Sequence, residues 1–208
     1  VEKFNPDKVY FVLEGYPQFR LELDEFYKSD RKRPDGAFLN QKNIIIELVK
    51  RCMPFNVARH PEFECDDVIA TLASAHSKIG HKCTIVSSDS DFIQLHNAFD
   101  VQLYNPIKKK FVEKPDYDYV TWKALRGDPT DNIPGIRGIG DKTALKIVKN
   151  PELLKSTLQD VEKRKIFERN VNLIRLVDLS ERIDEVEFNF GSSAMDVLYE
   201  SFDNFEFK

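Results

Sequence analysis

Short apolar runs and longer helical patterns alternate along the first half of the chain. The runs are rich in β-branched and aromatic residues, and they predict strands over 7–15, 55–61 and 81–88 and on both sides of Asn105 and Pro106. Apolar positions at helical spacing predict helices over 38–53, 64–80 and 117–127, with shorter helices in 19–36 and 91–97. Strands that alternate with helices predict an α/β fold whose strands are parallel.

The pattern changes near residue 115. From Asp116 onward we expect only helices and turns, including a stretch rich in glycine and proline that begins at Gly127. The sequence contains no internal repeat and no low-complexity segment. We therefore expect a change of architecture near 115, with 1–115 and 116–208 packed as one structural unit.

The composition is typical of a soluble globular protein, since 41% of the 208 residues are hydrophobic and 32% are charged. No apolar stretch approaches the length of a membrane span, and the first residues do not resemble a signal peptide. The three cysteines, Cys52, Cys65 and Cys83, are widely spaced and lie in or beside apolar patterns. We expect reduced thiols and a reducing compartment such as the cytoplasm, without membrane association.

The net charge of −4 does not by itself indicate a protein that binds nucleic acid. The charges are nevertheless segregated along the chain. Basic residues gather in 28–33, 108–110 and 137–149, and acidic residues gather in 64–67, 89–91 and 128–131. This segregation suits a protein that binds a polyanion around a metal-loaded centre, although composition alone favours ordinary solvated surface charge.

The acidic residues occur where predicted strands end or helices begin. A turn or a helix cap explains each group taken alone. Together they are expected to converge on one edge of one sheet, because ligands bind at the carboxyl ends of parallel strands. Close carboxylates repel unless cations neutralise them, and Mg²⁺ or Mn²⁺ suits a set of oxygen ligands. The candidate ligands are Glu14, Glu64, Asp66, Asp67, Asp89, Asp91, Asp128 and Asp131.

A second signal is the glycine pattern "GIRGIGDKTA" at 135–144. It resembles a dinucleotide-binding fingerprint, but no strand is predicted before it. A hairpin between helices fits better, with Gly135, Gly138 and Gly140 allowing a tight turn and exposed amides binding a backbone phosphate. Lys142, Arg137 and Lys146 would add positive charge. A plain glycine-rich turn between helices remains the alternative.

A third signal is the basic stretch "FRLELDEFYKSDRKRP" at 19–34. Tyr27 stands next to Lys28, with Arg31 and Arg20 in the same segment. An aromatic ring that stacks on a base and cations that bind phosphate are typical of nucleic-acid contacts. Basic surface loops are common, so this stretch is weak evidence when taken alone.

Four motifs then occur in order: "FYKSDR", "ECDDVIATLA", "IVSSDSDFIQL" and "GDPTDNIPGIRGIGDKTA". Together they resemble the 5′ nuclease family, which includes the 5′–3′ exonuclease domain of bacterial DNA polymerase I, flap endonucleases and phage 5′–3′ exonucleases. The stretch "GHKCTIVSSDSDFIQLH" is especially similar to the ribonuclease H of T-even-like bacteriophages. The resemblance covers roughly residues 9–180.

The resemblance implies a fold. It implies a PIN-like α/β core over 1–115, with a mostly parallel sheet flanked by helices and an arch at about 19–45. It also implies a helix–three-turn–helix region over 116–208 that binds duplex DNA, often with K⁺ in its hairpin.

The resemblance also implies residue roles and an activity. The acids at 64, 66, 67, 89, 91, 128 and 131 would hold two Mg²⁺ or Mn²⁺ ions, Lys28 and Arg31 would stabilise the scissile phosphate, and Tyr27 would stack on the adjacent base. Gly135, Gly138, Gly140 and Lys142 would hold the downstream duplex. The implied reaction is metal-dependent phosphodiester hydrolysis near 5′ ends of DNA flaps, nicks or RNA primers in replication and repair. Single-strand-binding or replication proteins are possible partners, and a phage enzyme would act in the host cytoplasm.

Two positions depart from the family pattern. Glu14 stands where the family usually has Asp, so it is expected either to bind metal or merely to end a strand. The family also has an earlier strand with a metal-binding Asp, whereas only 13 residues precede Glu14 here. The chain is a fragment, or takes that strand from another polypeptide, or lacks one ligand. The alternative function is therefore a DNA-junction-binding protein that is catalytically impaired or inactive. A generic metal-binding protein that acts on nucleotides is a third hypothesis, which the glycine hairpin disfavours.

Overall fold

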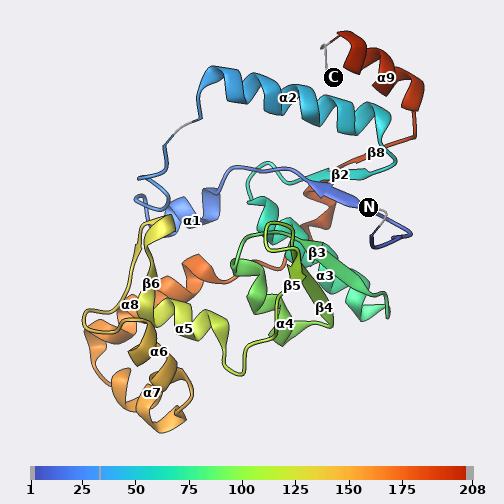
Figure 1. The fold of residues 1–208 in the computed structure, drawn as a ribbon. Coiled ribbons are helices and arrows are strands. Elements are labelled where there is room, and N and C mark those ends of the chain that lie inside the picture. Colours follow the sequence, from blue (N-terminus) through green and yellow to red (C-terminus); the bar gives the residue numbers. More distant parts are fainter. Residues whose placement is uncertain (1–2, 33, 205–208) are drawn as a thin grey trace. The chain divides into compact units, whose positions relative to one another are not determined.

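The computed structural model describes residues 3–32 and 34–204 (Figure 1). Arg33, which lies in the predicted arch, is outside the described residues. The strands are β1 (Tyr10–Val12), β2 (Asn56–Arg59), β3 (Cys83–Val86), β4 (Val101–Asn105), β5 (Lys110–Phe111), β6 (Gly127–Asp128), β7 (Ile133–Pro134) and β8 (Glu187–Phe190). The α-helices are α1 (Gln18–Leu23), α2 (Gly36–Cys52), α3 (Cys65–Lys78), α4 (Leu95–Ala98), α5 (Tyr119–Arg126), α6 (Asp141–Val148), α7 (Pro151–Thr157), α8 (Val161–Ile174) and α9 (Met195–Asn204). Short 3₁₀ helices are η1 (Asp91–Gln94), η2 (Pro129–Asp131) and η3 (Ser180–Glu185).

The chain divides into two compact units. The first unit comprises Val1–Tyr16, Lys32–Val68 and Glu181–Lys208. The second unit comprises Pro17–Arg31 and Ile69–Ser180. The boundary that follows Val68 falls inside α3, so this helix begins in the first unit and ends in the second.

The first unit is built on a three-stranded sheet of order β1-β2-β8. Strand β1 pairs parallel with β2, and β8 pairs antiparallel with β2. Asp35 caps the start of α2 by accepting a hydrogen bond from the backbone N of Phe38, with the two atoms 2.7 Å apart. The short strands β6 and β7 of the second unit and strand β8 of the first contradict the prediction that everything after Asp116 is helix and turn. Strand β8 forms because it pairs with the free edge of β2, which includes Val57 and lies far away in the sequence.

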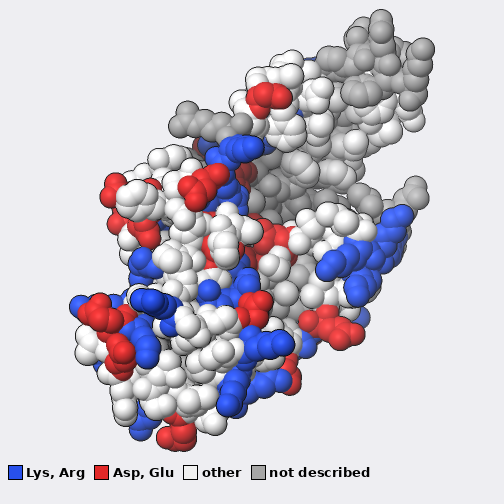
Figure 2. Space-filling view, turned by 60° about the vertical axis from the view of Figure 1, so that its left-hand side comes forward, with Lys and Arg blue, Asp and Glu red and all other residues white. Residues whose placement is uncertain are grey.

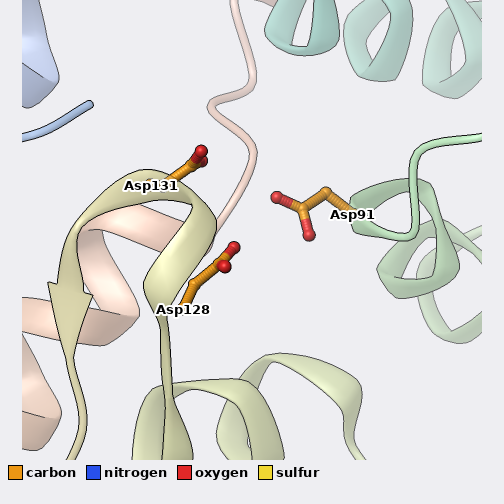
Figure 3. A group of neighbouring side chains, drawn as sticks. All are labelled: Asp91, Asp128 and Asp131. Carbon is orange, nitrogen blue, oxygen red and sulfur yellow. The ribbon is translucent and has the colours of Figure 1, made fainter. Parts of the chain in front are cut away.

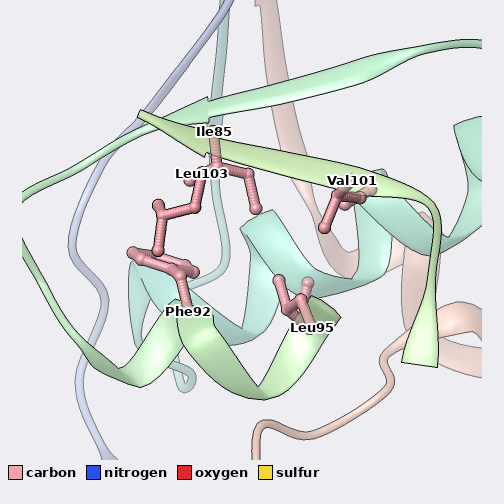
Figure 4. Close-up of a cluster of buried hydrophobic side chains, with 7 residues drawn as sticks. Ile85, Phe92, Leu95, Val101 and Leu103 are labelled. Atoms are coloured by element: carbon pink, nitrogen blue, oxygen red, sulfur yellow. The ribbon is translucent and has the colours of Figure 1, made fainter. Parts of the chain in front are cut away.

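The second unit contains a three-stranded sheet of order β3-β4-β5, with β3 and β4 parallel and β4 and β5 antiparallel. Ile85 of β3 and Leu103 of β4 project onto Phe92 of η1 and Leu95 of α4 (Figure 4). Ala70 and Ala73 of α3 complete this core cluster with Val101. Burying such apolar surface stabilises the fold by roughly 25 cal/mol per Å². The cluster supports η1, which carries Asp91.

The helical part of the second unit carries a β-hairpin between α5 and α6. Strands β6 and β7 pair antiparallel, with Gly127 opposite Pro134 and Asp128 opposite Ile133. Gly127 has a φ of +82°, which favours glycine, and a Cβ on Gly135 would lie 2.0 Å from the carbonyl oxygen of Arg126. Glycine at both positions therefore lets the hairpin lie directly against the end of α5.

Most predicted elements are confirmed, with ends that shift by a few residues. The strands of each three-stranded sheet are mixed, so a mostly parallel sheet is not confirmed. The division near 115 stays a prediction. Within the described ranges, no helix combines the length and apolar character that crossing a membrane requires.

Candidate metal centre

Three carboxylates of the second unit lie close enough to share a metal ion. Asp91, Asp128 and Asp131 each offer an oxygen, and these oxygens all lie within 4.8 Å of one another. Figure 3 shows the three side chains pointing toward a common space, Asp91 from one side and the other two from the hairpin. Carboxylate oxygens are the ligands that Mg²⁺ and Mn²⁺ prefer, so the donor set fits such an ion.

Local structure positions each of these acids. Asp91 is the first residue of η1, which follows β3 after a short turn. Asp128 ends β6, and its Oδ1 accepts hydrogen bonds from the backbone N and the hydroxyl of Thr130, at 2.9 and 2.6 Å. Asp131 lies in η2, and Asn132 closes that turn with a φ of 57°. Fixed turns thus place all three carboxylates.

Lys123 lies between two of the acids, and it was not among the predicted site residues. Its ammonium donates to Asp91 Oδ1 and lies 2.6 Å from Asp128 Oδ2, and its side chain is only 4% exposed. The sequence did hold a signal for it. Lys123 occupies the same face of α5 as Tyr119, Val120 and Ala124, all buried, and a lysine on an apolar helix face requires a partner.

Three residues from the segment around α1 contact Asp131. The guanidinium of Arg31 pairs with Asp131 Oδ1, and the ammonium of Lys28 lies 3.8 Å from Oδ2. The Tyr27 hydroxyl donates to the same Oδ2 at 3.3 Å, and the Lys28 backbone N donates to the Asp131 carbonyl at 2.9 Å. The predicted Lys28 and Arg31 are therefore brought to the candidate site, and both neutralise one of its acids.

The protonation of the site reflects burial and these charges. Burial raises the pKa of Asp91, and the opposing charge of Lys123 does not fully offset it. Burial acts in the same direction on Asp128, but hydrogen bonds from Lys123 and Thr130 outweigh it and lower its pKa. Burial alone would lower the pKa of Lys123, yet the charge of Asp91 and the hydrogen bonds to both acids raise it. Lys123 therefore carries a positive charge at neutral pH.

The same acids line a small open pocket of about 120 Å³. Its lining residues are Arg31, Asp89, Ser90, Asp91, Lys123, Arg126, Asp128, Thr130 and Asp131. Asp89 is exposed, and its Oδ1 accepts a hydrogen bond from the backbone N of Asp91 at 2.9 Å. The pocket thus combines carboxylates that can hold a cation with basic groups that can bind an anion, which is the charge pattern needed for a metal-bound phosphate.

The remaining predicted acids belong to the first unit and lie at or near the start of α3. Glu64 and Asp67 are buried at the start of α3, and Asp66 accepts a contact from the Cys65 thiol at 3.4 Å. Glu14 follows β1, and its Oε2 accepts a hydrogen bond from the Cys65 backbone N at 3.3 Å. Burial, with the charges of Asp66 and Glu14, raises the pKa of the Cys65 thiol well above its usual range. Negative charge therefore accumulates at this helix start.

The predicted duplex-binding residues lie in the turn at 135–140, between β7 and α6, and on α6 itself. Arg137, Lys142 and Lys146 are exposed, and Gly138 has a φ of +83°. Gly140 is the N-cap residue of α6 and has no side chain to occupy that position. On the face shown in Figure 2, Lys and Arg side chains are interspersed with Asp and Glu rather than forming one basic area. Any phosphate contact here therefore depends on particular residues.

Two predicted nucleic-acid contacts need correction. Arg20 is 3% exposed, and its guanidinium donates to the carbonyls of Leu173 and Arg175, at 2.9 and 3.2 Å. It caps the end of α8 and is not available as a surface contact to DNA. The Tyr27 ring is buried, 5% exposed, in a core cluster with Val120. A buried ring cannot stack on a base, so Tyr27 instead orients Asp131 through its hydroxyl.

Family models account for most of the chain. The model described as the 5′–3′ exonuclease N-terminal resolvase-like domain matches residues 1–124. The model described as the 5′–3′ exonuclease C-terminal SAM fold matches residues 114–191. The architecture is therefore a resolvase-like α/β region followed by a helical region of SAM fold.

Curated relatives include DNA polymerase I of several bacteria. The thermostable DNA polymerase I of Thermus thermophilus is 36% identical over 158 residues, which cover 72% of this chain and 19% of that protein. DNA polymerase I of Bacillus subtilis is 31% identical over 163 residues, covering 71% of this chain and 18% of that protein. The chain thus spans about a fifth of the length of the curated relatives it matches.

Solved structures show the same fold. The bacteriophage T5 5′-exonuclease with bound zinc ions has a TM-score of 0.70 and 20% identity, covering 88% of this chain and 79% of that chain. A pseudo-enzyme–product complex of the T5 flap endonuclease with DNA and metal ions has a TM-score of 0.62 and 21% identity, with the same coverage.

Proposed function

Because the chain belongs to the 5′–3′ exonuclease family, we propose that it is a divalent-metal-dependent, structure-specific 5′ nuclease. It hydrolyses phosphodiesters near the 5′ ends of flaps, nicked duplexes or RNA primers on DNA during replication or repair. The observation that carries this proposal is the group of Asp91, Asp128 and Asp131, whose oxygens lie within 4.8 Å of one another beside basic side chains.

Mg²⁺ or Mn²⁺, as two ions, is the cofactor that we propose for these acids. Bound there, the ions would activate water and stabilise charge on the attacked phosphate. The basic residues of the chain supply what the ions do not. Arg31 is about half exposed beside Asp131, so its guanidinium can bind a phosphate oxygen without leaving the site. Lys28 adds a second positive charge, near the other carboxylate oxygen of Asp131, Oδ2.

We propose that Asp89 and the acids of the first unit, Glu64, Asp66, Asp67 and Glu14, also serve as ligands, directly or through water. Support comes from the family membership and from the accumulation of carboxylates at the start of α3. Acids at a helix start are also stabilised by the helix dipole, by about 0.3–1 kcal/mol each. The roles of these residues therefore have to be separated by mutation.

The downstream duplex would bind the turn at 135–140 and α6. Arg137, Lys142 and Lys146 are exposed there, and the backbone amides at the start of α6 suit a phosphate. Gly135, Gly138 and Gly140 shape this turn, which we propose to be a helix–three-turn–helix element that can also hold K⁺. Residues 19–45 would form the arch of a nuclease core over 1–115, with 116–208 as the duplex-binding region. Replication or single-strand-binding proteins would be partners in the cytoplasm.

A flap assay tests the proposal directly. The chain is incubated with a duplex that carries a 5′-labelled single-stranded flap, in Mg²⁺ or in EDTA. We expect short labelled products in Mg²⁺ and none in EDTA. A purified, folded chain that binds the flap but does not cut it in Mg²⁺ or Mn²⁺ would contradict the nuclease proposal and favour a DNA-junction-binding protein.

The variant Asp91→Asn separates cutting from binding. It should lose cleavage while it retains affinity for the flap, because Asp91 lies in η1 whereas Arg137, Lys142 and Lys146 lie after β7 and on α6. Lys142→Ala should show the reverse pattern. It should weaken duplex binding about equally for all sequences and reduce the slope of log affinity against log salt by about 1.

A further inference from the structure

Lys123 is a buried cation that contacts the same carboxylates that the proposed metal would use. Its ammonium lies 2.6 Å from Asp128 Oδ2 and donates to Asp91 Oδ1. A buried ammonium is costly unless it is paired, and here the pairing partners are two acids that would otherwise repel each other. The lysine therefore removes much of the repulsion between Asp91 and Asp128.

The position of Lys123 is set by its helix. It projects from the middle of α5, and its ammonium lies 6.0 Å from the centre of the Tyr119 ring. Arg31, by contrast, reaches Asp131 with a side chain that is 54% exposed. An exposed arginine has room to move when an ion enters, whereas a buried lysine on a packed helix cannot move far. Lys123 thus stays near any ion that these carboxylates hold.

We propose that Lys123 is a positioning residue that holds Asp91 and Asp128 together in the metal-free protein and competes with a divalent ion for their oxygens. The inference rests on the proposed function, because it requires that these acids bind a divalent ion. Like charges close together in a poorly solvated site repel strongly, so the ammonium weakens metal binding. The fold in turn becomes less dependent on metal.

The test uses the full chain with Lys123→Met, which keeps an unbranched side chain only one atom shorter and removes its charge. Binding of Mn²⁺ is measured by the electron paramagnetic resonance signal of free Mn²⁺, and the unfolding midpoint is measured in EDTA and in Mn²⁺. We expect Lys123→Met to bind Mn²⁺ about tenfold more tightly or better than the wild type. Its midpoint should fall in EDTA and rise on adding Mn²⁺ by more than that of the wild type.

Lys149→Met is the matched control. Lys149 also forms an ion pair, 2.6 Å from Asp116, but on the surface, and neither residue lines the pocket of the three acids. This variant should leave the Mn²⁺ affinity and the metal-induced rise in the midpoint unchanged. A merely structural role for Lys123 would lower the midpoint equally in EDTA and in Mn²⁺ and would leave the affinity unchanged, and that result would overturn the inference.

A second variant covers the case in which Lys123→Met does not fold. Lys123→Gln is also uncharged and retains hydrogen-bond donors, and it should show the same tighter binding. If neither variant folds at any Mn²⁺ concentration, the inference is overturned, because an ion in that place should replace the lost charge.

The outcome also separates this inference from the proposed function. If the wild type and both Lys123 variants fail to bind Mn²⁺, the metal site itself fails and the proposed function with it. If all of them bind with equal affinity, the metal site stands and only the role of Lys123 is wrong.

Discussion

In the second unit, Asp91, Asp128 and Asp131 lie among cationic side chains, whereas in the first unit Glu14 and Asp66 lie around the start of α3. We call the acids of the first unit the first group and those of the second unit the second group. In the second group, basic side chains from α5 and from the segment around α1 pair with the acids. In the first group, a backbone amide of the helix start donates to Glu14. A buried ammonium is fixed by its helix, whereas the backbone amides at a helix start can donate hydrogen bonds to many kinds of anion.

The difference has consequences for metal binding. Carboxylates that are already neutralised by lysine and arginine should keep their arrangement without metal. Each carboxylate at a helix start gains about 0.3–1 kcal/mol from the helix dipole. We therefore expect the second group to be arranged before metal binds and the first group to respond more strongly to added metal.

The largest expected effect comes from breaking the second group. Asp128→Asn removes a charge that Lys123 and Thr130 both hold in place. We expect the rate of flap cleavage at saturating Mg²⁺ to fall about a hundredfold or more, since even partners outside the metal ligands contribute about 10–100-fold.

Single-turnover rates measure this effect, and the exposed Asp196 in α9 offers a control. Asp196→Asn should cleave at the wild-type rate. A wild-type rate for Asp128→Asn would remove this acid from the metal site.

The next effect concerns the hairpin that carries two of the acids. A Cβ on Gly135 would lie 2.0 Å from the carbonyl oxygen of Arg126, and backbone cannot yield as a flexible side chain does. Gly135→Ala should therefore lower the free energy of unfolding by about 2–3 kcal/mol. Denaturant titration measures this change in the free energy of unfolding. Gly140→Ala has open space around its new Cβ and should change stability far less, so equal losses in the two variants would contradict this packing.

The third effect concerns the reactivity of the Cys65 thiol, which lies beside the acids of the first group. Burial and the charges of Asp66 and Glu14 raise the pKa of the Cys65 thiol, so this thiol stays protonated at neutral and mildly alkaline pH. We expect Cys65 to react with a thiol reagent at least about tenfold more slowly than a free cysteine at pH 8, because the thiolate is the reactive form. Mass spectrometry after timed labelling gives the rate for each cysteine. Labelling of Cys65 as fast as free cysteine would show that negative charge does not accumulate there.

The smallest expected effect is the loss of stability when a hydrogen bond to Asp128 is removed. Burial raises its pKa, but hydrogen bonds from Lys123 and Thr130 outweigh burial and lower it. A lowered pKa in the folded state contributes stability that is present above the unfolded-state pKa and is lost as the pH falls through the folded-state value. Thr130→Val removes the hydroxyl that donates at 2.6 Å. It should cost about 1 kcal/mol at pH 7.

That difference from the wild type should vanish in acid, below the folded-state pKa of Asp128. Denaturant titrations of the metal-free protein at neutral and acidic pH measure it. Thr130→Ser keeps the hydroxyl and should behave as the wild type. If Thr130→Val lowers the free energy of unfolding equally at both pH values, the effect comes from packing and not from the hydrogen bond to Asp128.

Much of the fold was predictable because the elements have strong local signals. The apolar run before Ser87 and the acids at the start of α3 mark a strand and a helix without reference to the rest of the chain. Strand β8 was missed because its partner β2 lies far away in sequence, and local pattern does not report such pairing. The mixed direction of the strands was missed for the same reason.

The candidate site was predictable in its three acids and in Lys28 and Arg31, but not in Lys123. Asp91, Asp128 and Asp131 stand in recognisable motifs, whereas Lys123 stands in an ordinary helical pattern, and its role depends on which face of α5 is buried. Burial also explains why one predicted cation, Arg20, is not available to bind DNA. Arg20 has the residue type of a phosphate contact, yet carbonyls at the end of α8 take its guanidinium. Residue type indicates chemistry, but only packing shows which groups are available for it.

The most direct test of the metal centre maps where an ion binds along the chain. Fe²⁺ replaces Mg²⁺, and peroxide with ascorbate then cuts the backbone next to the bound ion. Mass spectrometry identifies the fragments. We predict cuts beside Asp91 and within 128–131 that excess Mg²⁺ suppresses, with further cuts in 64–67 if the first group also holds an ion. Cuts that spare both Asp91 and 128–131, or that excess Mg²⁺ does not suppress, would contradict the assignment of these carboxylates as the metal centre.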